Sequence, residues 1–325
     1  MICAIGLLSG GLDSTLAAKL LIDQGIEVCA VNFVSPFCTC TPKSAGCASV
    51  ITAVKQLGGI PLKRIVLGDD YLEMVKSPKY GYGRGVNPCI DCRIMKIRKA
   101  AEYMREIDAS FLFTGEVLGQ RPMSQHRRAM DIIDKESGIA GFILRPLSAG
   151  VLSPTIPEQE GWVNRDLLLT ITGRSRKRQL SLASEKGIHD FQCAAGGCLL
   201  TDKNFALRMK DYLSHCDKPS CADMHLLKIG RHFRLANGDE IVVAHDDNEG
   251  TRLLQLRCDR ATILAAENFS APVVLLRGID KASALRKMLE YTKHTIAENA
   301  EIRVINDEGE QTFFMSEYCK EILTQ

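Results

Sequence analysis

Apolar positions in the first 34 residues change their spacing twice, and these changes outline three elements. Residues 2–8 form a continuous apolar run, which predicts a buried strand. Residues 12–24 place apolar side chains at positions 12, 16, 17, 20 and 21, the spacing of one helix face. Residues 28–34 again read as a strand. A strand, a helix and a second strand in so short a length predict a βαβ unit, and therefore a parallel sheet.

The same alternation continues as far as Pro146. The pattern predicts helices at residues 49–57, 91–106 and 124–135, and strands at residues 63–67, 111–114 and 142–144. Strands that alternate with helices in this way are typical of the α/β class. We therefore expect a doubly wound parallel sheet.

Beyond Pro146 the alternation is lost. Residues 151–162 look irregular, residues 165–186 and 204–213 look helical, and residues 214–223 have the polar, proline-containing character of a linker. We expect a first domain over residues 1–180, a cysteine-containing helical extension and linker over 181–223, and a second domain over 224–325.

The last hundred residues suggest a small α+β domain. The turn sequence ANGD predicts a hairpin between residues 233–235 and 240–244, and NDEGEQ predicts another near the end of the chain. Between them we expect strands at residues 253–256 and 273–276 and a helix over residues 281–295.

Composition fits a globular protein with more than one domain, since 46% of its 325 residues are hydrophobic. The N-terminal apolar run is too short to span a membrane and lacks a basic leader, so we expect a cytoplasmic protein.

Residues 1–224 carry 28 Lys and Arg against 23 Asp and Glu, whereas residues 225–325 carry 13 against 16. The first part therefore allows an anionic partner, but the charge does not demand one.

Thirteen cysteines in such a chain are not expected to form a disulfide framework, because the cytoplasm keeps thiols reduced. Cys3, Cys29, Cys258 and Cys319 lie in apolar surroundings, which predicts ordinary packing. Cys216 and Cys221, in the linker, are expected to be incidental, and the remaining cysteines are candidates for chemistry.

The string SGGLDS, residues 9–14, ends the first predicted strand and opens the first predicted helix. Backbone N–H groups and the helix dipole favour an anion there, and Gly10 and Gly11 leave room for it. Ser9 and Ser14 offer hydroxyl donors, and Asp13 can hold Mg²⁺ against phosphates. No Gly-Lys-Ser/Thr follows, so the loop is not of the Walker A type.

This loop resembles the PP-loop of ATP pyrophosphatases, which cut ATP between its α and β phosphates and leave an adenylate on the substrate. Residues 113–125, FTGEVLGQRPMSQ, resemble one branch of these enzymes, the tRNA 4-thiouridine synthetase (ThiI-type) branch. This resemblance implies an adenine nucleotide α-hydrolase-like fold. By this resemblance, the residues that contact ATP beyond the loop are Asn32, Phe33, Arg98 in RIMKIR, Gly115 and Gln125.

A second group of residues points to sulfur chemistry. Cys89 and Cys92 in NPCIDC open a predicted helix and can share a metal or cluster. The third thiol is expected in CAAGGC, as Cys198 or, alternatively, Cys193. The pattern resembles cluster-dependent tRNA thiolation enzymes and implies a [4Fe-4S] cluster on Cys89, Cys92 and Cys198. A persulfide relay without a cluster remains open.

Three more cysteines, Cys38, Cys40 and Cys47, follow the second predicted strand. They fit either a zinc site that lacks an evident fourth ligand or a reactive loop without a metal.

Together these features predict an ATP-dependent sulfurtransferase that adenylates a uracil carbonyl oxygen in tRNA, with Asp13, Cys89, Cys92 and Cys198 in catalytic roles. A sulfur donor such as a cysteine desulfurase is expected as a partner. The side chains expected to bind RNA phosphates are Arg121, Arg127, Arg128, Arg174, Arg176, Lys177 and Arg178.

The sequence KIGRHFRL, residues 228–235, makes the second domain resemble the NFACT-type RNA-binding domain, although its acidic balance argues against this. The chain also departs from the synthetase family, because only eight residues precede Ser9 where that family carries an RNA-binding THUMP region. Two alternatives stay open. One is a ligase or sulfurtransferase that adenylates a small molecule, and the other is a nucleotide-binding iron–sulfur sensor without catalytic activity.

Overall fold

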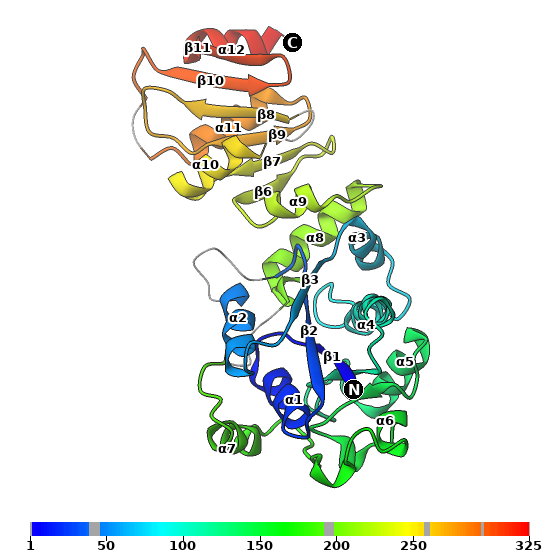
Figure 1. The fold of residues 1–325 in the computed structure, drawn as a ribbon. Helices are drawn as coiled ribbons and strands as arrows, with labels where there is room; N and C mark the ends of the chain where they lie inside the picture. The colour runs from blue at the N-terminus through cyan, green and yellow to red at the C-terminus, as the bar shows by residue number, and fades with distance from the viewer. Residues whose placement is uncertain (1, 39–45, 192–197, 257–260, 294–295, 325) are drawn as a thin grey trace. The chain divides into compact units, whose positions relative to one another are not determined.

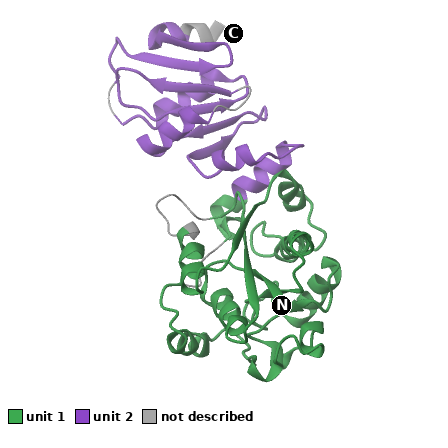
Figure 2. Cartoon of the chain, in the orientation of Figure 1, with its two compact units in different colours: residues 1–206 green, residues 207–325 purple. Residues whose placement is uncertain are grey.

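The computed structural model describes the chain except for residues 1, 39–45, 192–197, 257–260, 294–295 and 325. It divides into two compact units, Met1–Ala206 and Leu207–Gln325 (Figure 2). This division splits the expected extension 181–223 between the two units. No helix among the described residues is long and apolar enough to cross a membrane.

Unit 1 contains a five-stranded parallel sheet (Figure 1). Its strands are β1 (Cys3–Leu7), β2 (Glu27–Val34), β3 (Leu62–Val66), β4 (Phe111–Thr114) and β5 (Ile143–Leu144). The order β3-β2-β1-β4-β5 runs outward from β1 in one direction and then returns past it in the other. The doubly wound α/β class is therefore confirmed, and the crevice between the ends of β1 and β4 is where such sheets bind ligands.

The helices of unit 1 match most of the predictions. They are α1 (Leu12–Ile22), α2 (Gly46–Gln56), α3 (Asp69–Lys76), α4 (Cys89–Glu106), α5 (Arg127–Ser137), α6 (Ile156–Gln159) and α7 (Lys177–Glu185), with 3₁₀ turns η1 (Ala149–Val151), η2 (Arg165–Leu167) and η3 (Leu199–Thr201). One expectation is wrong, because the helix expected over residues 165–186 is confined to η2 and α7. In addition, α3 was not predicted.

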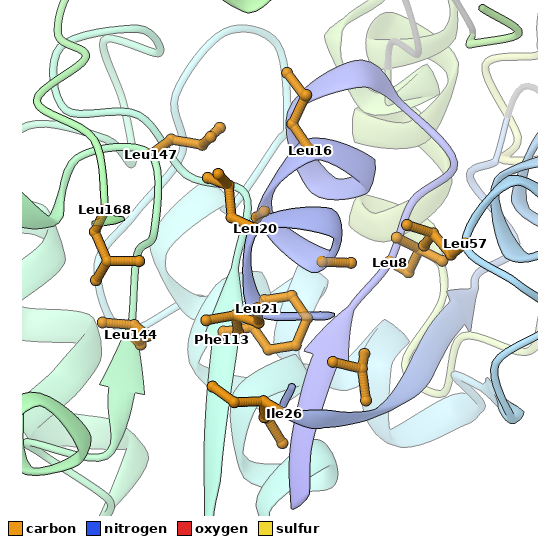
Figure 3. Close-up of a cluster of buried hydrophobic side chains, with 14 of the residues drawn as sticks. Leu8, Leu16, Leu20, Leu21, Ile26, Leu57, Phe113, Leu144, Leu147 and Leu168 are labelled. Carbon is orange, nitrogen blue, oxygen red and sulfur yellow. The ribbon is translucent and has the colours of Figure 1, made fainter. Parts of the chain in front are cut away.

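Alternating side chains of the strands build a core on each face of the sheet. Ala4 and Phe113 face α1, α2 and α7, and Figure 3 shows Phe113 together with Leu20 and Leu21 of α1. Ile5 and Leu112 face α4 and α5 on the other side. This alternation explains why the apolar runs of β1 and β4 are continuous, since a parallel sheet is covered on both faces.

Unit 2 contains a six-stranded antiparallel sheet in the order β11-β10-β8-β9-β7-β6. The strands are β6 (Arg231–Arg234), β7 (Glu240–Val243), β8 (Ala261–Ala266), β9 (Val274–Arg277), β10 (Glu301–Asn306) and β11 (Gly309–Phe314), and the helices are α8 (Lys203–His215), which begins in unit 1, α9 (Cys221–Leu226), α10 (Asp247–Gln255), α11 (Lys281–Glu290) and α12 (Met315–Thr324). The α+β class and both hairpins are confirmed.

The strand expected at residues 253–256 is wrong, because these residues lie in and just after α10. The Asp246 side chain accepts a hydrogen bond from the N–H of Glu249 and caps this helix, and Asp247 and Glu249 place negative charge in its first turn. Four apolar or amide residues in a row cannot by themselves distinguish a strand from a buried helix end.

Candidate active site

The loop of residues 9–11 joins β1 to α1 and is braced by its own hydroxyl groups. The N–H of Ser9 donates to the Ser14 hydroxyl at 3.3 Å, and the Ser14 hydroxyl donates to the Gly11 carbonyl at 3.0 Å. Gly11 is the N-cap of α1, and no side chain in the described part of the chain caps the helix there. The first N–H groups of α1 are therefore left for another acceptor, as an anion site requires.

Glycines around the loop serve close backbone packing as well as access. A Cβ on Gly10, whose φ is +76°, would lie 2.6 Å from backbone atoms of Ser49 and Val50. A Cβ on Gly115 would lie 2.4 Å from the Ser14 nitrogen. A Cβ on Gly11 would meet only the Ser9 hydroxyl at 3.5 Å, so Gly11 is the glycine with an open face.

Asp13, in the first turn of α1, pairs with an arginine far away in the sequence. Its Oδ2 lies 2.7 Å from the guanidinium of Arg176, the N-cap residue of α7. Its Oδ1 is buried and has no hydrogen-bond partner within the described parts of the chain. A carboxylate oxygen of this kind suits a hard cation such as Mg²⁺.

The guanidinium of Arg121 is influenced by two other guanidinium groups, those of Arg93 and Arg176. Desolvation lowers the pKa of Arg121. The charges of Arg93 and Arg176 lower this pKa further, whereas Asp13 and Cys89 raise it. The Asp13 carboxylate and the Cys89 thiol are therefore both within electrostatic range of Arg121. A set of cations at this position attracts an anion that reaches from the loop toward the thiols.

A buried ion-pair network holds the segment after β4. Glu116 is 2% exposed, and it lies 2.9 Å from Arg93 Nε and 3.0 Å from Arg145 Nε. Burial alone would raise the pKa of Glu116, but the charges of Arg93 and Arg145 lower it. Arg145 also binds both oxygens of Asp134, at 2.6 and 2.8 Å. Glu116, Arg93 and Arg145 were not among the predicted site residues, although Glu116 lies within the string that carried the resemblance.

Besides Gly115, two of the predicted ATP contacts outside the loop hold or line the site. The Asn32 amide donates to the Leu8 carbonyl at 2.9 Å, so it fixes the chain just before the loop. Gln125 is 4% exposed, and its Oε1 has no hydrogen-bond partner among the residues described. A buried amide oxygen without a partner fits a position that a ligand completes. Phe33 is half-buried and packs on the core beneath α4.

The structure does not bring Arg98 to the loop. Its guanidinium donates to the Glu136 carbonyl at the end of α5, with Nε 2.9 Å away, and its side chain is 55% exposed. Arg93 lies five residues earlier on α4 and joins the network around Glu116 instead. Five residues rotate a helix by about 140°, so the two arginines lie on different faces.

Cys89, Cys92 and Cys198 share one neighbourhood. Cys89 begins α4, and burial and the nearby Cys92 raise its pKa. Burial raises the pKa of Cys198 to about 12, and Cys92 and Cys89 raise it further. The hydroxyl of Tyr71, which is 1% exposed, donates to Cys92 Sγ at 3.2 Å. Burial raises the pKa of Tyr71, as do Cys92, Cys198 and Cys38.

The thiols do not by themselves form a closed metal site. Within the described ranges, no group of three or more His, Cys, Asp or Glu side chains is arranged to hold a metal ion. Thiols are nevertheless the ligands that iron–sulfur clusters use, and these three lie within each other's electrostatic influence. Cys40 and Cys193 lie outside the described residues, and nothing is described of the Cys47 side chain.

The side chains expected to bind RNA separate into two groups. Arg176 contacts Asp13, and Arg127 donates to the Val151 carbonyl at 2.6 Å, so both have partners within the protein. Arg128, Arg174, Lys177 and Arg178 lie exposed, and Arg121 is also accessible to solvent although desolvation lowers its pKa.

Two family models match the chain. The model described as "Thiamine biosynthesis protein (ThiI)" matches residues 3–151, and the model described as "NFACT protein RNA binding domain" matches residues 230–321.

Curated proteins similar to this chain include the tRNA-specific 2-thiouridylase MnmA of Marinobacter nauticus, 25% identical over 225 residues, with 63% of this chain and 52% of the relative covered. MnmA of Bacillus subtilis is 26% identical over 218 residues, with 63% and 54% covered. The chain spans about half the length of these relatives.

Similar solved structures include a 4-thiouridine synthetase in complex with RNA and ATP, at 19% identity and a TM-score of 0.40, with 70% of this chain and 52% of that chain covered. The U34-tRNA thiolase NcsA of Methanococcus maripaludis, solved with its [4Fe-4S] cluster, has 15% identity and a TM-score of 0.35, with 70% of each chain covered. The sequence matches confirm both predicted resemblances: residues 3–151 match the ThiI family model, and residues 230–321 match the model of the NFACT-type RNA-binding domain.

Proposed function

We propose that the protein is an ATP-dependent tRNA sulfurtransferase that adenylates a uracil carbonyl oxygen and replaces it with sulfur. The observation that carries this proposal is that Asp13 of the loop and the Cys89 thiol both lie within electrostatic range of one guanidinium, that of Arg121. A nucleotide bound at the loop therefore has its phosphates near the groups that handle sulfur. The names of the MnmA relatives, tRNA-specific 2-thiouridylases, support the same reaction class.

The reaction requires both the loop that binds ATP and the cysteines that handle sulfur. A uracil carbonyl oxygen is a poor leaving group, and attack on the α-phosphate of ATP converts it into the leaving group AMP while pyrophosphate departs. The open N–H groups of α1, with Arg121 and Arg176, bind the phosphates, and Asp13 holds Mg²⁺ against them. A sulfur nucleophile then attacks the activated carbon and releases AMP.

Cys89, Cys92 and Cys198 hold the sulfur, either as ligands of a [4Fe-4S] cluster or as the site of a persulfide. In the persulfide case the outer sulfur bonds to the activated carbon, and a second cysteine thiolate then attacks the inner sulfur, so that the thiouridine leaves and a cysteine disulfide forms. Three cysteine ligands leave one iron open, and when such a cluster is bound that iron can carry a sulfide to the substrate. In either case the sulfur comes from a donor such as a cysteine desulfurase. Tyr71 orients Cys92 through its hydrogen bond.

Unit 2 provides a second contact with the RNA. Arg231 lies over the Tyr291 ring at 4.7 Å, and Lys287 lies over the Phe233 ring at 4.6 Å. The two rings are half-buried and their centres are 6.1 Å apart. Cations beside aromatic rings suit phosphates and unpaired bases, so this cluster is where we expect unit 2 to bind tRNA.

The test is pyrophosphate release with and without unmodified tRNA, followed by analysis of thiolated uridine. We expect tRNA to stimulate release, Asp13→Ala to abolish it, and Cys198→Ser to keep it while losing thiolation. Cys29→Ser, a buried thiol of β2, is the matched control and should keep both activities. Release without RNA stimulation would favour adenylation of a small molecule, and the absence of any release would favour a nucleotide sensor.

The sulfur carrier is tested separately on protein purified without oxygen. About four irons per chain with matching sulfide, lost in Cys92→Ser, would support the cluster. An iron-free protein that still thiolates tRNA would support the persulfide.

A further inference from the structure

Cys38 lies opposite Cys198, although 160 residues separate them in the sequence. The two form an antiparallel β-bridge outside the named strands. Beside them, the Leu199 N–H donates to the Phe37 carbonyl at 3.1 Å. Because the hydrogen bond belongs to the neighbouring pair, Cys38 and Cys198 form the non-hydrogen-bonded pair of this bridge.

That kind of pair brings side chains closest together. Opposite residues in it have Cα atoms about 4.5 Å apart and side chains on one face of the ladder. This separation falls at the short end of the range that disulfides span, about 4.4–6.8 Å between Cα atoms. Both cysteines are free thiols and half-buried, so small reagents can reach them.

Both sides of the bridge are held in place. The Ser35 N–H donates to Cys38 Sγ at 3.3 Å, and the Phe37 ring packs against the rings of Tyr71 and Phe205, with centres 6.0 Å apart in each case. A disulfide across the bridge therefore needs rotation of side chains rather than rearrangement of the backbone.

Cys198 is also tied to the other thiols. The Val86 N–H donates to the Leu200 carbonyl at 3.1 Å, so the segment that follows Cys198 is attached just before the NPCIDC loop. Cys198 thus has two sets of neighbouring thiols, since it pairs with Cys38 in the bridge and lies within the electrostatic influence of Cys89 and Cys92.

We propose that Cys38 and Cys198 form a reversible disulfide, and that this bond withdraws Cys198 from Cys89 and Cys92. The oxidant is a small disulfide such as oxidised glutathione. One cysteine thiolate attacks it and releases the first glutathione thiol, and the second cysteine thiolate then attacks the mixed disulfide and releases the second. Two thiols lose two electrons and two protons, and one glutathione disulfide gains them. The consequence for sulfur transfer rests on the proposed function, whereas the disulfide itself does not.

The chain supplies a matched control in Cys3 and Cys29. These thiols are also neighbours, since burial and Cys29 together raise the pKa of Cys3 to about 12. However, Cys29 pairs in register with Ile5, and Cys3 pairs with Glu27, so the two cysteines are offset along the ladder. They should remain reduced under conditions that oxidise the bridge pair.

The experiment uses the full chain, freed of iron with a chelator and reduced, and then equilibrated in glutathione buffers of increasing oxidation. After alkylation and digestion, mass spectrometry with fragmentation identifies the linked cysteines. We expect a Cys38–Cys198 link that approaches one per chain, is at least tenfold reduced in Cys38→Ser and Cys38→Ala, and is unchanged in Cys3→Ser. Thermal melting shows whether the variants remain folded.

Linkage of Cys198 to Cys89 or to any cysteine other than Cys38, or full alkylation of Cys198 in every buffer, would overturn the proposal. In a second arm, oxidation should reduce tRNA thiolation more than tenfold in the wild type, reversibly with dithiothreitol, and leave Cys38→Ser active. A reduced enzyme without thiolation activity would refute the proposed function and leave the linkage result standing, so the two failures are distinguishable.

Discussion

Replacing Gly115 with alanine tests whether the site depends on contact between two backbone segments. Gly115 follows β4, and its α-carbon faces the start of α1. An added Cβ would lie 2.4 Å from the Ser14 nitrogen and 2.5 Å from the Asp13 carbonyl carbon. Ordinary contacts begin at 3.4 Å, so the segments must separate by roughly 1 Å. Neither neighbour can yield by rotation, because the atoms belong to the backbone.

The structure sets the magnitude in two parts. Overpacking of this kind lowers the free energy of unfolding by about 1–3 kcal/mol. Replacing glycine also reduces the freedom of the unfolded chain, which raises the free energy of unfolding by about 0.4–1 kcal/mol. We therefore expect a net loss of about 1–2 kcal/mol in the free energy of unfolding, or a fall of about 2–8 °C in Tm for a unit of this size. Because the displaced atoms begin α1, pyrophosphate release should fall by about 100-fold in kcat/KM.

Gly68→Ala is the matched control. Gly68 follows β3 in the way that Gly115 follows β4, but its Cβ would meet only the Asp70 carboxylate at 3.7 Å. Its unfolding free energy should change by less than about 1 kcal/mol and its pyrophosphate release should be unchanged. A Gly115→Ala variant with wild-type Tm and wild-type turnover would refute the close contact on which the argument depends.

Three further predictions follow from single contacts. Glu116→Gln should lower the free energy of unfolding at pH 7 by about 3–5 kcal/mol, because it breaks a buried ion pair. Since the folded pKa of Glu116 lies below its ordinary 4.5, the wild type loses this stability as the pH falls below 4.5, so urea titrations at several pH values should show the difference shrinking. Arg176→Gln should raise the KM for ATP about tenfold and lower the Mg²⁺ concentration at half-maximal rate, with the exposed Arg174→Gln unchanged in both. Tyr71→Phe, which keeps the packing on Phe37, should lower the free energy of unfolding in urea by about 1 kcal/mol, and an unchanged midpoint would show that its hydrogen bond contributes nothing.

Local patterns in the sequence predicted the elements that position the site. The strand before Ser9 and the helix after Gly11 depend on apolar spacing and on turn residues within a dozen positions, and both lie where they were expected. The error at residues 253–256 also concerns a local pattern. Asp246 is a helix-capping signal that precedes this apolar run, and the prediction of a strand did not use it.

Contacts between distant segments could not be predicted in this way. Arg176 reaches Asp13 across 163 positions, and nothing in the basic run around it shows which arginine turns inward. The resemblance identified the basic helix α4 and chose Arg98, whereas the structure places Arg93 in the ion-pair network. A family motif identifies the helix, but the packing of that helix against its neighbours decides which of its arginines pairs with Glu116.

The cations and the carboxylate of the site make competing demands. Asp13 presents one oxygen to Arg176 and keeps the other buried without a partner in the described residues. A divalent cation bound to Asp13 would lie next to the guanidinium, and two positive groups at that spacing repel each other. Phosphates relieve this conflict, because Arg176 can turn to them while the metal keeps the carboxylate. Mg²⁺ and ATP should therefore bind this loop together rather than in succession, and Arg176 is the residue that couples them.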